Sequence, residues 1–310
     1  MPISDYKFSH FKYDTNFISY ILRENQLYDD AYILENCASL LFFKIVETLD
    51  YKMSFRLKRA NFCRKRICPM CTWRRAQKWR ARLINVLPIL NELYPDHRFL
   101  LLTLTVKNCH ITELKQHIKI LNKGWNAINK KRDKREKLSF IQGYIKAIEV
   151  SRPKNNLDFA HPHIHALLMV DESYFANAYQ YLSNKEWQKI WQKAAKLDYE
   201  PIVDIRAIEK HEHESVIPEI ASYVTKPEDF IKDENYYFNP LTAKFGHYYH
   251  LTKEPKDQIQ DSGKWLIEYA DQMYKRRAIS SGGVLQEFFR DIEKNLHTDN
   301  EDLIGKSMII

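Results

Sequence analysis

Two histidines stand two residues apart in the stretch AHPHIHALLMV, which begins at Ala160. Side chains two apart on a β-strand point to the same face, so the imidazoles of His163 and His165 could bind one divalent cation. Glu149, in the apolar stretch before them, could complete a site that keeps open positions for water or substrate. The alternative is a pair of histidines hydrogen-bonded within a sheet, but alternation beside a strand carboxylate favours a metal.

A second candidate group lies in the stretch EIASYVTK. Glu219 and Tyr223 are four residues apart, and Lys226 follows three residues later, so a helix would place all three on one face. A tyrosine, a carboxylate and a cation in that arrangement could act as nucleophile, base and phosphate clamp. A tyrosine with such neighbours is more often an ordinary packing position, so this group gains weight only beside a metal that polarises a phosphate.

Three of the five cysteines have the spacing of metal ligands in FCRKRICPMC: Cys63-x4-Cys68-x2-Cys71. A tetrahedral zinc site needs a fourth ligand, and Cys37, His97 and His110 are the candidates. The alternative of ordinary buried thiols fits poorly, because charged clusters flank these cysteines. In a reducing compartment, thiols or metal ligands are expected rather than disulfides.

Positive charge is concentrated around the same cysteines. Between Lys52 and Arg82 the chain has twelve Lys or Arg residues and no acidic residue, within an overall formal charge of +8. This block predicts an anionic partner such as nucleic acid. The residues expected to contact DNA are Arg64, Arg66, Arg74, Arg75 and Lys78, with Trp73 and Trp79 on the same surface. Alternatively, Arg74 and Arg75 only solvate a helix face.

Composition sets the remaining bounds. The 310 residues are 45% hydrophobic and 13% aromatic, which is enough for a sizeable core. An apolar leader and a long apolar span are not seen, so a cytoplasmic protein without a membrane partner is expected. The seven glycines argue against the usual Gly-rich phosphate loops.

Hydrophobic periodicity predicts the elements that position these groups. Strands are expected at 98–107, 140–151, 162–170 and 201–209, and helices at 112–135 and across 173–194. The order β-α-β-β-α-β is the ferredoxin-like pattern, in which the first and third strands are central and the second flanks the third. The histidine strand is then central, with Glu149 on its neighbour. Residues before 98 are expected to be mainly helical, and further helices are predicted near 263–277 and after Gly283.

Several motifs together resemble those of plasmid rolling-circle replication initiators, which are HUH endonucleases. They are FLLLTLTV, KAIEVS followed by HPHIH, EIASYVTK, the segment CRKRICPMCTWRR with its upstream cysteine, and KRRAISSGG. The resemblance covers roughly residues 37–285. One tyrosine occupies the catalytic stretch, so the similarity is to the single-tyrosine initiators.

This resemblance implies a mechanism and an architecture. Tyr223 would nick one DNA strand, keeping a 5′-phosphotyrosine and freeing a 3′-OH primer, and Glu219 would activate water to end the round. His163, His165 and Glu149 would bind Mg²⁺ or Mn²⁺, while Cys37, Cys63, Cys68 and Cys71 would hold a structural Zn²⁺. The expected fold is α+β: a helical zinc-binding, DNA-contacting region (1–95), an HUH domain (96–230) and a mainly helical extension packed on it (231–310). Origin DNA, a host helicase and the replication machinery would be the partners.

Two other functions use much of the same sequence. A relaxase or a single-strand transposase would share the chemistry but act on a different DNA. A zinc-stabilised DNA-binding regulator with relict nuclease motifs would bind DNA without cutting it, and replacement of Tyr223 by Phe would then change nothing.

Overall fold

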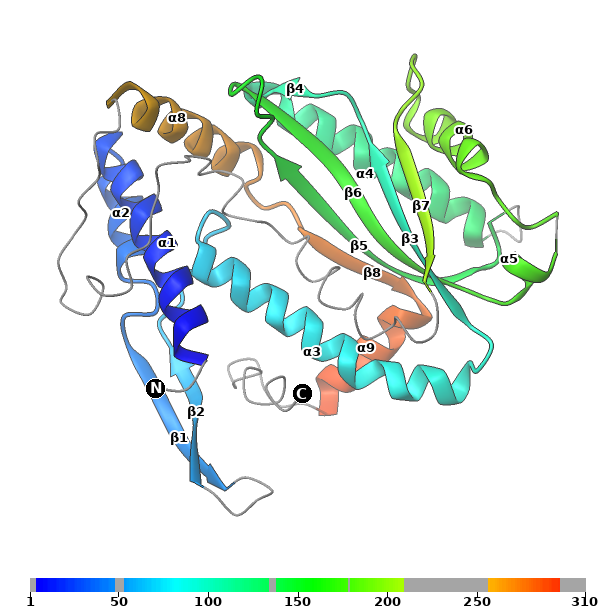
Figure 1. The fold of residues 1–310 in the computed structure, drawn as a ribbon, viewed down its shortest axis with the longest axis horizontal. Coiled ribbons are helices and arrows are strands. Elements are labelled where there is room, and N and C mark those ends of the chain that lie inside the picture. The colour runs from blue at the N-terminus through cyan, green and yellow to red at the C-terminus, as the bar shows by residue number, and fades with distance from the viewer. Residues whose placement is uncertain (1–3, 48–52, 134–137, 178, 209–255, 296–310) are drawn as a thin grey trace.

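The computed structural model describes residues 4–47, 53–133, 138–177, 179–208 and 256–295 (Figure 1). The protein is a mixed α+β protein built on an antiparallel sheet with the strand order β7-β3-β6-β5-β8. The bounds of its strands are β3 Arg98–Thr105, β5 Ile141–Ser151, β6 Phe159–Val170, β7 Val203–Ile208 and β8 Ile279–Gly283. A two-residue strand, β4 (Cys109–His110), pairs with the start of β6.

The order of the four predicted strands is confirmed. β3 and β6 are adjacent at the centre, β5 flanks β6, and β7 lies on the outer side of β3. The strand β6 begins three residues earlier than expected, at Phe159, and the long β5–β6 connection is correspondingly shorter. Residues of β7 alternate between the two faces of the sheet, because Val203 and Ile208 pack into different apolar clusters.

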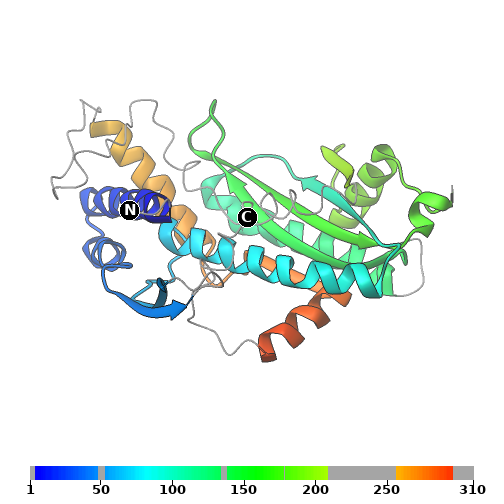
Figure 2. The ribbon, with the colours of Figure 1, turned by 60° about the horizontal axis from the view of Figure 1, so that its bottom comes forward.

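Helices cover both faces of the sheet (Figures 1 and 2). One face packs against α4 (Leu114–Asp133) and α6 (Asn184–Ala195), through core residues such as Trp125 and Trp191. The other face packs against α3 (Pro69–Leu93) and α9 (Val284–Asn295). Along β5 and β6, successive apolar side chains point alternately into the two cores. This alternation also fixes the face to which each polar residue of these strands points.

The region before residue 98 contains a β-hairpin that the helical prediction missed. Helices α1 (Ser4–Glu24) and α2 (Tyr28–Glu35) precede it, and α3 follows it. The hairpin pairs β1 (Leu41–Glu47) with β2 (Met53–Ala60) in a separate two-stranded sheet. The stretch MSFRLK of β2 alternates apolar and polar residues, a period-2 signal for a strand that the helical prediction overlooked.

The C-terminal helices are present, with an additional strand between them. Helix α8 is Lys256–Gln272 and begins before the expected 263, and α9 starts directly after Gly283. Between them, β8 adds an edge strand to β5. The short stretch ISSGG has little apolar character, so its strand conformation depends on the partner edge rather than on local preference.

The single helix predicted across 173–194 is wrong. The structure has a four-residue helix α5 (Ser173–Ala176) and then α6, with an irregular connection between them. A capping box at Ser183 starts α6, since its hydroxyl accepts from the Glu186 amide while the Glu186 carboxylate accepts from the Ser183 amide. The Tyr174 hydroxyl donates to the Leu182 carbonyl and fixes the connection. None of the described helices is both long enough and apolar enough to cross a membrane.

Candidate metal centres

Strand pairing brings Glu149, His163 and His165 together. Glu149 is directly opposite His163 in the β5–β6 register, and His165 lies two residues further along β6. Glu149 and His163 are buried, and His165 is half-buried. One carboxylate oxygen of Glu149 lies 3.4 Å from Nε2 of His163 and 3.0 Å from Nε2 of His165. The three predicted ligands therefore form one cluster, on the sheet face that α3 and α9 cover.

Hydrogen bonds on the far side of each imidazole orient the two histidines. Nδ1 of His163 lies 3.1 Å from the carbonyl oxygen of His161, which can only accept, so Nδ1 carries a proton and Nε2 is the nitrogen that can donate to Glu149 or, when deprotonated, bind a metal. Nδ1 of His165 lies 3.1 Å from Oγ1 of Thr103, on the neighbouring strand β3. This support of the imidazoles on the side away from the ligand position is typical of metal-binding histidines. The role of Thr103 was not predicted, although the alternating threonines in LLLTLTV were a signal for it.

The charge of Glu149 suits a cation. Burial alone would raise the pKa of this carboxyl, but hydrogen bonds and charges from His163 and His165 outweigh it and lower the pKa to about 2. The group is therefore ionised at neutral pH. Neighbouring ligands of an octahedral ion with bonds of about 2.1 Å lie about 3.0 Å apart, close to the separations seen here. Two imidazole nitrogens and one carboxylate oxygen thus fit Mn²⁺ or Mg²⁺ with positions left for water or substrate.

His161 lies next to this cluster without joining it. Its ring centroid is 4.9 Å from that of His163, and its Nδ1 lies 2.5 Å from Oδ1 of Asn108. It lies near the start of β6, directly before Pro162.

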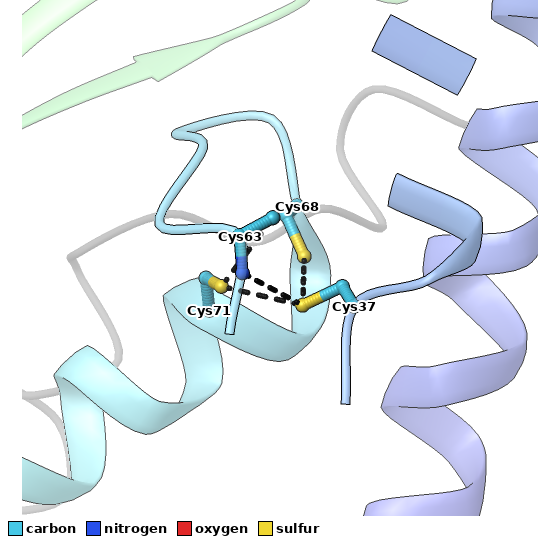
Figure 3. Close-up of side chains that lie close together, drawn as sticks. All are labelled: Cys37, Cys63, Cys68 and Cys71. Atoms are coloured by element: carbon cyan, nitrogen blue, oxygen red, sulfur yellow. Dashed lines mark hydrogen bonds between the residues drawn. The ribbon is translucent and has the colours of Figure 1, made fainter. Parts of the chain in front are cut away.

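Four cysteines form a second cluster, at the junction of α2, β2 and α3 (Figure 3). Cys37 follows α2, Cys63 follows β2, Cys68 caps α3, and Cys71 lies in its first turn. The Sγ atom of Cys37 is 3.5 Å from that of Cys71 and 3.6 Å from that of Cys68. The Cys63 and Cys71 sulfurs are 3.6 Å apart. Four sulfurs at about 2.3 Å from a zinc ion would be about 3.8 Å from one another, so this cluster fits tetrahedral zinc.

The fourth member of the cluster is Cys37, as the resemblance implied. His97 instead hydrogen-bonds to the Tyr94 carbonyl, and His110 packs edge-on against Phe159. Hydrogen bonds from the other three cysteines lower the pKa of Cys37. The Cys63 amide donates to Cys37 and the Arg64 amide donates to Cys71, which is the backbone support that bound thiolates receive. The fifth cysteine, Cys109, is buried elsewhere, in β4.

The basic residues around this cluster differ in their surroundings. Arg64 is exposed, and Arg74 lies with its guanidinium 4.6 Å from the centre of the Phe62 ring. Arg66 donates to the Tyr269 hydroxyl and to the Arg276 carbonyl, so it connects the cysteine segment to α8 and the residues after it. Burial, and then the charge of Arg66, lower the pKa of Arg75. Lys78 is half-buried on α3.

The tryptophans do not form the expected DNA surface. Trp73 is only 7% exposed and stacks on Phe11, with ring centroids 5.1 Å apart. Trp79 packs edge-on against Phe289 of α9 at 5.5 Å. Both rings face the core because α3 lies between α1 and α9, which the sequence of α3 alone could not indicate. The remaining predicted catalytic residues, Glu219, Tyr223 and Lys226, lie outside the described residues, as does the helix expected to contain them.

Comparison with known proteins decides the family. The profile of the family described as replication protein (Rep_1) matches residues 54–308. The chain belongs to the replication protein family. Curated relatives named "Protein rep" include one from Lactiplantibacillus plantarum, 32% identical over 88% of this chain and 78% of its own length. Another, from Streptococcus pneumoniae, is 31% identical over 82% of this chain and 70% of its own length.

A further relative, "Protein rep" from Staphylococcus aureus, is 31% identical over 69% of this chain and 88% of its own length. The resemblance to plasmid replication initiators that the motifs carry is thus confirmed at the level of the replication protein family. No solved structure matches the chain. Both candidate metal centres lie within or next to the matched segment, with Cys37 alone preceding it.

Proposed function

We propose that this member of the replication protein family is a rolling-circle initiator that nicks one strand of a plasmid origin, with an HUH endonuclease fold. The observation that carries the proposal is the Glu149–His163–His165 cluster on the adjacent strands β5 and β6, with both Nε2 atoms directed toward one carboxylate oxygen. Membership of the replication protein family and the strand order of the sheet support it.

The chemistry is a transesterification. The Tyr223 phenol oxygen bonds to the scissile phosphorus, and the bond from phosphorus to the 3′-oxygen breaks. The phenol loses its proton and the departing 3′-oxygen gains one, which leaves a 5′-phosphotyrosine and a free 3′-OH primer. A tyrosine with an ordinary pKa of about 10 is a weak nucleophile at neutral pH, so the phosphate must be activated.

Glu149, His163 and His165 would hold Mg²⁺ or Mn²⁺, which when bound polarises a nonbridging phosphate oxygen. Lys226 would neutralise charge on the same phosphate. At termination, Glu219 would take a proton from the water that attacks the phosphotyrosine. The DNA would then be released by hydrolysis rather than by attack of a second tyrosine. The four cysteines would hold a structural Zn²⁺ that fixes α3 and the hairpin base, and the cations of the 52–82 block would bind origin DNA. A host helicase would then unwind from the nick.

The test uses a labelled single-stranded oligonucleotide library with Mn²⁺, with or without EDTA, followed by a denaturing gel. Wild-type protein should give a protein-linked DNA band that disappears with EDTA and with Tyr223→Phe. Tyr179→Phe is the matched control, because Tyr179 is 92% exposed and far from the proposed chemistry in sequence. Bound but uncut DNA across a library that contains the target would instead support the DNA-binding regulator. Recovery and sequencing of the linked DNA would distinguish a replication origin from a relaxase or transposase target.

A further inference from the structure

The β1–β2 hairpin exposes an unusual amount of apolar surface. Phe43, Ile45 and Met53 are 55%, 60% and 70% exposed, and Phe42 is 51% exposed. The hairpin projects from the body of the protein, away from the large sheet (Figures 1 and 2). Single exposed apolar residues are normal, but several together on one projecting element indicate a binding surface.

The strand register divides these side chains between the two faces of the hairpin. Phe43 pairs with Leu57, Ile45 with Phe55, and Glu47 with Met53, so Phe43, Ile45 and Met53 share one face. After the bulge beside Phe42, the next pair is Phe42 and Arg59, whose guanidinium lies 5.4 Å from the centre of the Phe42 ring. Arg59 thus covers the Phe42 ring, whereas the face with Phe43, Ile45 and Met53 is open to a ligand.

The base of the hairpin is anchored, although its outer part is exposed. Leu41 packs against the main core, and Leu57 is buried. The Asn61 side chain accepts from the Leu40 amide and donates to the Asn36 carbonyl, which joins the two strands at their origin. Cys37 and Cys63 lie just before β1 and just after β2, so the cysteine cluster holds both ends of the hairpin.

Charge identifies the partner. Strand β2 contains Arg56, Lys58 and Arg59 and no acidic residue, and it begins the block of twelve cations that continues along α3. Lys58 and Arg59 lie beside Phe42, on the face opposite Phe43, so a second copy or an apolar protein packed on the apolar face would leave these cations without counter-charges. Nucleic acid satisfies both features, because phosphates pair with the cations while bases contact apolar and aromatic side chains.

We propose that the β1–β2 hairpin binds unpaired bases of opened DNA through Phe43, Ile45 and Met53, while the cations of β2 hold the adjacent backbone. This inference rests on the proposed function, since a strand must leave the duplex before a tyrosine can reach its phosphate. Apolar side chains inserted at unstacked base steps are a known way for proteins to hold DNA open. The hairpin therefore supplies the single strand that the metal centre uses.

The test compares binding of the full-length protein to two DNAs by fluorescence anisotropy. One is a fully paired duplex, and the other has the same sequence with a central unpaired bubble. Wild-type protein should prefer the bubble, and the double variant Phe43→Ser with Ile45→Ser should lose about tenfold or more in affinity for it, with little change for the duplex. The single variant Phe43→Tyr, which keeps an aromatic ring, should retain the preference for the bubble over the duplex.

Tyr179→Ser and Tyr274→Ser are the matched controls, because these tyrosines are 92% and 68% exposed but lie outside the hairpin. Equal bubble affinity in the hairpin double variant and the wild type would overturn the inference. So would a change in sedimentation of the variant without a change in DNA binding, which would assign the face to a protein contact.

Neither DNA needs to be cut, so the outcome is independent of nicking. A bubble preference lost in the variant of a protein that never forms a covalent DNA adduct would support the inference and contradict the proposed function. If the hairpin double variant nicks single strands and binds the bubble as the wild type does, the result would support the proposed function and contradict the inference.

Discussion

Thr103 on β3 is directly opposite His165 on β6, and its hydroxyl oxygen lies 3.1 Å from Nδ1 of the imidazole. A hydroxyl can donate to this nitrogen when Nε2–H faces Glu149, and it can accept from Nδ1–H when Nε2 binds a metal. Valine has almost the same shape as threonine but can do neither. The first strand of the sheet therefore positions a proposed ligand of the candidate metal centre.

We expect Thr103→Val to weaken Mn²⁺ binding about 10-fold or more, because His165 loses the hydrogen bond that orients its ring. The measurement is Mn²⁺ titration of the DNA-free protein by electron paramagnetic resonance. Thr103→Ser should bind Mn²⁺ like the wild type. Thr105→Val is the matched control two residues along, where the hydroxyl donates to the Ile202 carbonyl instead. Equal losses in both valine variants would show a packing effect rather than orientation of His165.

The cysteine cluster should determine the zinc content. Purified protein is expected to contain about one zinc per chain, and Cys37→Ser should remove most of it, because a structural site needs all four ligands. Elemental analysis of the variant measures this directly. Cys109→Ser provides the comparison, since it replaces a buried cysteine that lies outside the cluster. Full zinc occupancy in Cys37→Ser would remove that residue from the ligand set.

Two arginines of the basic block, Arg66 and Arg74, should differ in what they contribute. Arg66→Ala should reduce the free energy of unfolding by about 1–3 kcal/mol, because Arg66 donates to the Tyr269 hydroxyl and the Arg276 carbonyl. Urea unfolding measures this loss.

Arg74→Ala should instead reduce the magnitude of the negative slope of log K against log salt for duplex binding by about 0.9, as expected when one phosphate contact is removed. Arg74→Lys should preserve that slope, and an unchanged slope in Arg74→Ala would show that Arg74 does not contact phosphate.

Lys146 gives the fold a distinctive pH dependence. It is 6% exposed, on the sheet face that packs against α4, and its amine donates to Oδ1 of Asn122. Burial lowers the pKa of this amine from 10.5 to about 8. Between pH 8 and 10.5 the unfolded chain then binds more protons than the folded one, so this lysine makes stability rise with pH in that window and leaves it unchanged below.

The expected contribution is up to about 3 kcal/mol, and Lys146→Met should remove that rise. Urea unfolding at pH 7.5 and at pH 10 would measure it as a difference between wild type and variant, since other groups titrate over the same range. Lys119→Met, at an exposed position of α4, is the control and should keep the wild-type difference. If the free energy of unfolding changed with pH by the same amount in Lys146→Met and in the wild type, the buried amine would have an ordinary pKa.

Much of the sheet could be predicted because its strands are long and apolar and its helices carry a clear 3.6-residue period. The failures have two origins, one local and one not. Tyr174 and Trp187 belong to different helices although their spacing is typical of one, because the capping box at Ser183 starts a new helix between them. The edge strand at Ile279 depends on pairing with β5, which its own composition does not indicate.

The sequence by itself determined which residues could carry chemistry. The alternation of His163 and His165 and the spacing of Cys63, Cys68 and Cys71 are local properties, because one strand or one turn sets the direction of each side chain. Tertiary structure decided what joins them. Only antiparallel register places Glu149 and Thr103 against the histidines, and only the packing of α1 against both α2 and α3 brings Cys37 to the other cysteines. Packing also buried Trp73 and left Phe43 exposed. Contacts between distant segments depend on the arrangement of the whole chain, and no local pattern encodes them.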